Sequence, residues 1–74
     1  MGDDYKYVVV EEEMAGEYGK LKSYGIAVED GRKKLDEVND ISIDREKVKK
    51  LAETFNELEL SLVHFRDVLE DLLP

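Results

Sequence analysis

The hydrophobic pattern changes its period once, close to residue 40, and this change limits the fold more than any other feature. Before it, short runs rich in valine and tyrosine are separated by glycine-containing links, as in strands joined by tight turns. After it, apolar residues recur at three- and four-residue steps, as in amphipathic helices. A chain of 74 residues is one domain, residues 1–74. The pattern predicts an α+β fold, a three-stranded antiparallel β-meander followed by an αα-hairpin.

The links set the expected boundaries and the strand register. A three-residue loop at 15–17, Ala-Gly-Glu, places Met14 opposite Tyr18 and Val8 opposite Tyr24. An Asp-Gly pair follows the second strand and is a strong hairpin signal, because glycine readily adopts a positive φ. We expect strands at about 5–14, 18–30 and 32–38, and helices at about 44–56 and 62–73.

This register leaves apolar side chains on both faces of the sheet. A sheet with one solvated face alternates more cleanly, so either the helices cover both faces or one face contacts another chain. Alternatively, the tyrosines lie on an exposed face with their hydroxyls in water. The expected first face carries Val8, Val10, Met14, Tyr18, Tyr24, Ile26 and Val28, and the second carries Leu21 and Ala27. Tyr5, Tyr7 and Val9, also on the second face, are the candidate interface residues.

The helical half carries its own end signals. Asp44 is a good N-cap, and Ile43 before it is an expected buried anchor that packs against Val48. Asn56 is a plausible end for the first helix, because asparagine tolerates the left-handed conformation. Ser61 is the expected N-cap of the second helix, with its hydroxyl accepting the N–H of His64.

The charge and composition exclude several classes of function. The formal net charge is −8, and a short basic run at 45–50 is too small to reverse it. Nucleic-acid binding needs the opposite field, so we expect no nucleic-acid partner. There is no apolar run long enough to span a membrane and no signal-peptide pattern at the start. With no cysteines, the composition fits a reducing cytoplasm.

The only histidine, His64, is the one candidate for chemistry. It lies three residues before Asp67, a spacing at which two side chains can meet on a helix, with Arg66 between them. Catalysis would need a third participant, and no serine lies in a nucleophile context. The structural interpretation of His64 is therefore favoured, and we expect no catalytic residue, no metal and no cofactor.

The second half resembles a family of short uncharacterised bacterial proteins that is classed as a domain of unknown function. The likeness covers about residues 23–73 and rests on an Asp-Ile-Ser-x-Asp … Leu-Ser-x-x-His-x-x-Asp-Val pattern. The residues that carry it are Tyr24, Gly25, Asp40, Ile41, Ser42, Asp44, Asn56, Leu60, Ser61, His64, Asp67, Val68 and Asp71. The resemblance implies a small cytoplasmic bacterial protein and supplies no reaction.

Together these features predict a small acidic protein–protein interaction or regulatory module without catalytic activity. Its partner is an unknown protein, with a second copy of the chain, a homodimer, as one candidate. The alternative is a small-ligand-binding protein or enzyme that uses His64, Arg66 and Asp67.

Overall fold

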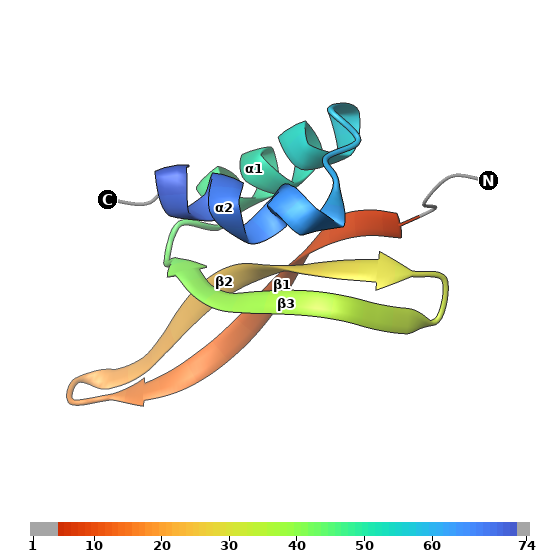
Figure 1. Cartoon of the computed structure of the whole chain (residues 1–74). Helices are drawn as coiled ribbons and strands as arrows, with labels where there is room; N and C mark the ends of the chain where they lie inside the picture. The colour runs from red at the N-terminus through yellow and green to blue at the C-terminus, as the bar shows by residue number, and fades with distance from the viewer. Residues whose placement is uncertain (1–4, 73–74) are drawn as a thin grey trace.

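The computed structural model describes residues 5–72 and contains three antiparallel strands followed by two helices (Figure 1). This order confirms the predicted α+β fold. The elements are β1 (Tyr5–Gly16), β2 (Gly19–Asp30), β3 (Lys33–Ser42), α1 (Arg45–Glu57) and α2 (Leu62–Leu72).

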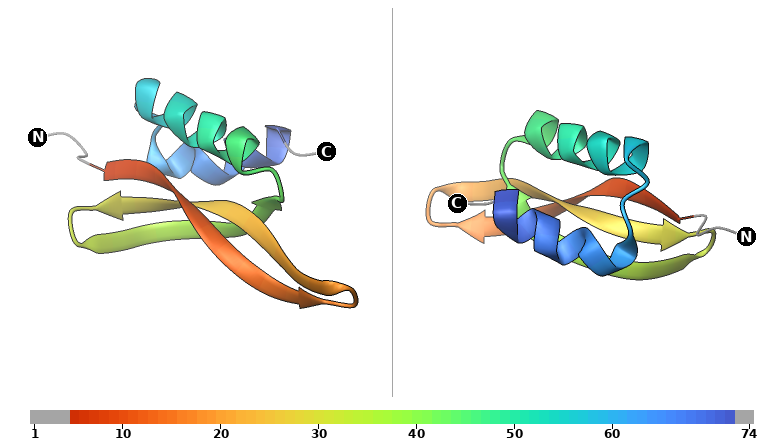
Figure 2. Two further views of the ribbon diagram at one scale, coloured as in Figure 1. Left: turned by 180° about the vertical axis from the view of Figure 1, so that it is seen from behind. Right: turned by 45° about the horizontal axis from the view of Figure 1, so that its top comes forward.

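The molecule has two layers. The sheet has the order β1-β2-β3, and both helices lie on the same side of it (Figure 2). The far end of the β1–β2 hairpin extends beyond the helices (Figure 1). We call this end, residues 11–22, the arm, and all of its residues are exposed. On the arm, Lys20 pairs with Glu13 at 3.6 Å and Lys22 pairs with Glu11 at 3.5 Å. These cross-strand ion pairs offset part of the charge of the Glu11–Glu13 run.

The expected β1–β2 register is wrong. β1 continues to Gly16, which pairs with Gly19, so the turn contains only two residues and Gly19 has a φ of +121°. Met14 therefore pairs with Leu21, and Val8 pairs with Ala27. A shift by an odd number of residues exchanges the faces of one strand relative to the other. The face beneath the helices consequently gathers Tyr5, Tyr7, Val9, Tyr24, Ile26 and Val28.

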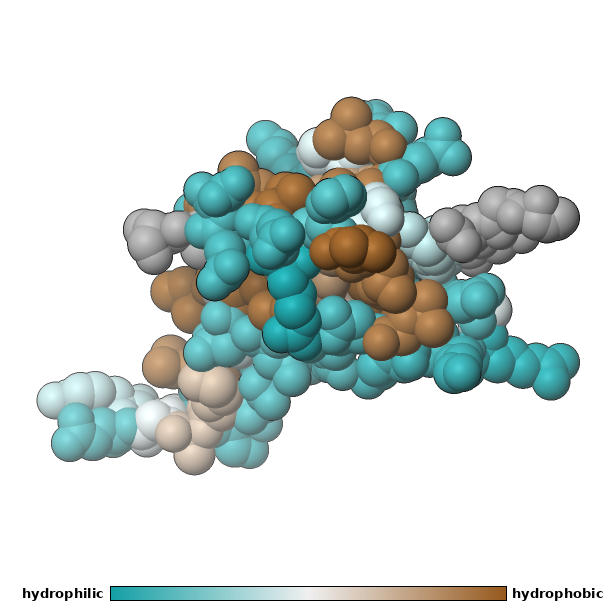
Figure 3. Space-filling model, viewed as in Figure 1, coloured by the Kyte–Doolittle hydropathy of each residue, from teal (hydrophilic) through white to brown (hydrophobic). Residues whose placement is uncertain are grey.

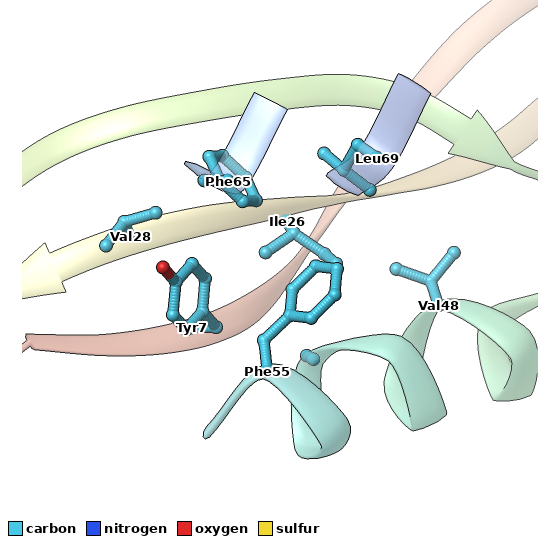
Figure 4. Close-up of a cluster of buried hydrophobic side chains, with 8 residues drawn as sticks. Tyr7, Ile26, Val28, Val48, Phe55, Phe65 and Leu69 are labelled. Carbon is cyan, nitrogen blue, oxygen red and sulfur yellow. The ribbon is translucent and has the colours of Figure 1, made fainter. Parts of the chain in front are cut away.

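The core lies between this face and the helices (Figure 4). Phe55 of α1 and Phe65 of α2 meet edge to face, with ring centroids 6.1 Å apart. Both rings also contact Tyr7 of β1, at centroid distances of 5.5 and 5.3 Å. These edge and tilted contacts add to the burial of the rings. The other buried members of the cluster are Ile26, Val28, Val48, Ala52 and Leu69.

The third strand is longer than predicted because it contains an irregularity. Its pairing with β2 shifts between Ile26↔Val38 and Tyr24↔Ser42, and Asp40 in that interval has a φ of +55°. A Cβ at Gly25 would overlap the carbonyl oxygen of Val38, so glycine is required where β3 crosses closest to β2. The strand then resumes pairing and leads directly into α1.

The helix ends confirm one predicted cap and correct three other expectations. The Asp44 side chain accepts the N–H groups of Glu46 and Lys47, as expected for an N-cap. Ile43 is 74% exposed and is not a buried anchor, because the link turns its side chain away from the core. At the start of α2, the His64 N–H bonds the carbonyl oxygen of Ser61 instead of the hydroxyl.

The third correction concerns the end of α1. The helix continues past Asn56 to Glu57, and Leu58 is its C-cap in the right-handed conformation. The left-handed position belongs to Glu59, with a φ of +50°. Asn56 stays inside the helix because its side chain bonds the neighbouring strand. Residue 73, the predicted end of the second helix, lies outside the described residues.

Candidate functional site

The three residues of the predicted ligand or enzyme site do not form a shared pocket. His64 and Asp67 are exposed on α2, and neither lines any of the three cavities described for this chain. Arg66 is held by Asp36 of β3, through Nε at 3.0 Å and an Nη at 2.7 Å. This bidentate ion pair connects α2 to the sheet. Arg66 therefore has a structural partner, whereas the His64 side chain makes no hydrogen bond or ion pair found within residues 5–72.

The Asp36–Arg66 pair changes the ionisation of both groups. The hydrogen bond from Arg66 holds the pKa of the Asp36 carboxyl below its ordinary value, against the opposing effect of desolvation. The same bond raises the pKa of the Arg66 guanidinium. Arg66 also borders a shallow cavity of about 250 Å³ with Val38, Leu69 and Glu70. The pair connects the helix layer to the sheet.

The predicted interface tyrosines face the helices. Tyr7 is 3% exposed, and Tyr5 and Val9 are half-buried against the core cluster. The Tyr7 hydroxyl donates to the carbonyl oxygen of Leu60 at 2.7 Å. The Tyr5 hydroxyl accepts the Leu62 N–H at 2.7 Å and donates to the same carbonyl. The two tyrosines thus satisfy backbone groups of the α1–α2 link.

Asn56 completes this connection between the link and the sheet. Its side-chain oxygen accepts the Tyr7 N–H at 2.8 Å, and its amide nitrogen donates to the Tyr7 carbonyl oxygen at 2.9 Å. The amide therefore occupies the outward hydrogen-bonding position of an edge strand, as another strand would. Burial among these groups, with a smaller contribution from the Tyr5 hydroxyl, raises the pKa of Tyr7 to about 12.

The other face of the sheet carries apolar side chains with no helix over them. We call this the open face, and its apolar residues are Val8, Val10, Met14, Leu21 and Ala27. Met14 is 39% exposed and Leu21 is 58% exposed, while Val8 and Val10 are half-buried. The Ser23 hydroxyl lies beneath the Met14 sulfur at 3.9 Å. These side chains form an apolar strip from the body of the sheet onto the arm, with Glu12 between Val10 and Met14.

A comparison with models of protein families shows which family the chain belongs to. A model described as "Family of unknown function (DUF6514)" matches residues 3–74. The chain belongs to the DUF6514 family. This confirms the resemblance to a family of unknown function, while the Asp-Ile-Ser motif and a bacterial origin stay predictions. No curated protein and no solved structure matches the chain.

The DUF6514 description assigns no activity, so the surfaces of this member carry the functional question. Neither described helix is long and apolar enough to cross a membrane. Within residues 5–72, no three histidine, cysteine or acidic side chains cluster as metal ligands would. The three-residue loop expected from the sequence does not bring Val8, Val10 and Met14 together with Leu21 on one face, so it does not predict the open face. The two turn residues, Glu17 and Tyr18, are not the Asn-Gly or Asp-Gly pair that is typical of a two-residue turn, so the sequence does not determine the loop length here.

Proposed function

We propose that this DUF6514 chain is a non-catalytic protein–protein interaction or regulatory module, and that its open face binds a second copy of the same chain. The observation that carries the proposal is the strip of Val8, Val10, Met14 and Leu21 on a sheet face without helices. Moving apolar side chains of this kind out of water lowers the free energy of the system. A domain of this size also buries only roughly 60% of its unfolded surface when it folds alone, less than a larger domain does.

The shape of the open face suits face-to-face stacking of two sheets. Its central strand carries Ser23, Gly25 and Ala27, whose small side chains allow another layer to approach closely. Stacked sheets pack about 10 Å apart, with their strands nearly aligned. A standard interface buries about 800 Å² on each partner. The molecule measures 48 × 28 × 18 Å along its principal axes, so its two longest dimensions together span more than this area.

The charges along β1 favour a two-fold arrangement with antiparallel strands. On the open face, Lys6 precedes Val8 and Glu12 follows Val10. A two-fold axis between the two valines sets Lys6 opposite Glu12 of the partner subunit, and this contact occurs twice. Within one chain the two charges lie about 20 Å apart along the strand, so they complement each other only between copies.

The finer expectations about the setting of the protein belong to the same proposal. We propose that it acts in a bacterial cytoplasm, in keeping with the cysteine-free composition and the acidic charge. The acidic charge further disfavours nucleic acid as a partner. The enzyme alternative loses support, because Arg66 is bonded to Asp36 and His64 lines none of the described cavities.

The test compares charge insertion on the two sides of the molecule. Val10→Asp and Leu21→Asp place a carboxylate in the strip, and Val63→Asp places one on α2, where Val63 is 79% exposed. Circular dichroism first establishes that each variant is folded. In sedimentation velocity, we expect the wild type and Val63→Asp to be dimers, and the two strip variants to be monomers.

Leu21→Asp keeps the test decisive if Val10→Asp unfolds, because Leu21 lies on the arm outside the core cluster. A monomeric wild type, or a folded Leu21→Asp protein that remains dimeric, would contradict the proposal.

A further inference from the structure

We propose that a groove between the two helices binds a small amphiphilic carboxylate, with an aliphatic chain on the groove floor and the anionic head on Lys47 and Lys50. The groove lies on the helix layer and is independent of the open face. Its volume is about 400 Å³, and Ile41, Ser42, Lys47, Lys50, Leu51, Thr54 and Leu72 line it. This volume is within the range of sites for small molecules.

The groove is apolar because the apolar stripes of the two helices meet there. Leu51 is half-buried beside the stripe of α1, and Leu72 is 53% exposed at the last turn of α2. Half-buried Ile41 at the end of β3 supplies the floor between them. In Figure 3, brown surface lies beside teal surface at the end of the helix layer where α2 finishes. An aliphatic chain placed there would bury these three side chains.

The charge at the groove is opposite to the charge of the whole protein. The chain has a formal net charge of −8, yet the lining residues within 5–72 include two lysines and no carboxylate. Lys47 and Lys50 lie one turn apart on α1 and make none of the ion pairs found within residues 5–72. Two cations beside an apolar floor complement a ligand with one anionic end and one apolar end.

Two hydroxyl groups add hydrogen-bonding capacity at the rim. The Ser42 oxygen accepts the Asp44 N–H at 3.0 Å, which leaves the hydroxyl hydrogen of Ser42 available as a donor. Thr54 lies one turn beyond Lys50 on the same wall. These donors are compatible with carboxylate oxygens. The limited volume favours a free medium-chain carboxylate over a lipid that remains in a bilayer.

The experiment is an NMR titration of the full chain with octanoate, followed through the backbone amide signals. We expect saturable shifts that cluster at Ile41, Lys47, Leu51 and Thr54. Octylamine has the same chain with a cationic head, and acetate has the same head without the chain. We expect no saturable shifts at these amides with either compound.

Lys49 provides a control position, because it is exposed on α1 but does not line the groove. We expect the double variant Lys47→Glu/Lys50→Glu to bind octanoate about tenfold more weakly or worse, which is about 1.4 kcal/mol. Lys49→Glu changes the net charge at an adjacent position, and its affinity should stay within about twofold of the wild type.

Three results would overturn the proposal: no saturable shifts with octanoate, equal binding of octylamine, or equal weakening by Lys49→Glu. If the double variant were unfolded, the octanoate affinity of Lys50→Gln would be compared with that of Lys49→Gln. Dimerisation is measured separately, so failure of the groove leaves the open-face proposal intact, and the reverse also holds.

Discussion

The two faces of the β1–β2 ladder use similar side chains for different purposes. Beneath the helices, Tyr7 and Val9 pair with Val28 and Ile26 and join the core. On the open face, Val8 pairs with Ala27, and no helix lies over this pair. Both faces carry apolar side chains, but within residues 5–72 the aromatic contacts and the bonded tyrosine hydroxyls lie on the inner face. Apolar content alone therefore does not distinguish a core from an exposed surface.

The largest expected effect comes from the inner face. Phe65→Ala removes a fully buried ring that contacts Tyr7 and Phe55, and we expect a loss of roughly 3–5 kcal/mol in unfolding free energy. Val10→Ala on the open face should cost about 1 kcal/mol or less for the monomer, because Val10 is already half exposed. Urea denaturation at low protein concentration gives both values.

Phe65→Leu keeps most of the apolar volume and provides a measurable variant if Phe65→Ala does not fold. Equal losses for a Phe65 variant and Val10→Ala would mean that the two faces contribute alike to folding.

The second effect uses pH to separate a buried tyrosine from an exposed one. Burial raises the pKa of Tyr7 from 10.0 to about 12, so the unfolded chain loses this proton first as the pH rises. The stabilisation is complete below pH 10, and roughly 2–3 kcal/mol of it is lost by pH 12. Thermal melts between pH 9 and 12 measure the loss.

Tyr7→Phe should flatten this alkaline decline, and Tyr18→Phe should not, because Tyr18 is 99% exposed in the arm turn. An identical decline in both variants would assign it to groups other than Tyr7.

The third effect concerns the bond between α1 and the edge of β1. Asn56→Ala leaves the Tyr7 N–H and carbonyl without their partners, and we expect a loss of roughly 1–3 kcal/mol. Asn39→Ala is the control, since Asn39 is exposed on β3, and it should change stability by about 0.5 kcal/mol at most. Urea denaturation measures the unfolding free energy of both variants. Similar losses would mean that the bonds between Asn56 and Tyr7 do not stabilise the fold.

The smallest expected effect comes from the Asp36–Arg66 ion pair between β3 and α2. Arg66 lowers the pKa of Asp36, so the folded protein gains stability from this carboxylate at neutral pH. That gain is lost as the pH falls below 3.8 and through the lowered pKa of the folded state. We expect Asp36→Asn and Arg66→Gln each to reduce this acid dependence, and the double variant to add little more. Additive losses in urea unfolding at pH 7 would contradict the pairing.

The strand and helix content could be predicted because local patterns determine it. The valine and tyrosine runs, the second hairpin and the Asp44 cap all depend on neighbouring residues. The β1–β2 register could not be predicted in the same way, because a change of one residue in the turn reverses the face of every following side chain. A three-residue loop puts Ile26 on the same face as Val8, whereas Ile26 pairs with Val9 on the other face.

The candidate surfaces depended on contacts that are distant in the sequence. Asn56 looks like a helix end locally, but its amide bonds Tyr7, 49 residues away. Arg66 is likewise fixed by Asp36, 30 residues away. The groove combines the end of β3, one wall of α1 and the last turn of α2. Periodicity identified the apolar stripes of these elements but not the space left between them.

The most direct test of the two-fold open-face dimer is a mixing experiment with two charge variants. Lys6→Glu alone places two negative charges at each contact, and Glu12→Lys alone places two positive charges there. In an equimolar mixture, each contact of the mixed pair joins one positive and one negative residue. We predict by sedimentation velocity that each variant alone is a monomer and that the mixture is a dimer. A mixture that stays monomeric, or single variants that dimerise like the wild type, would contradict the account.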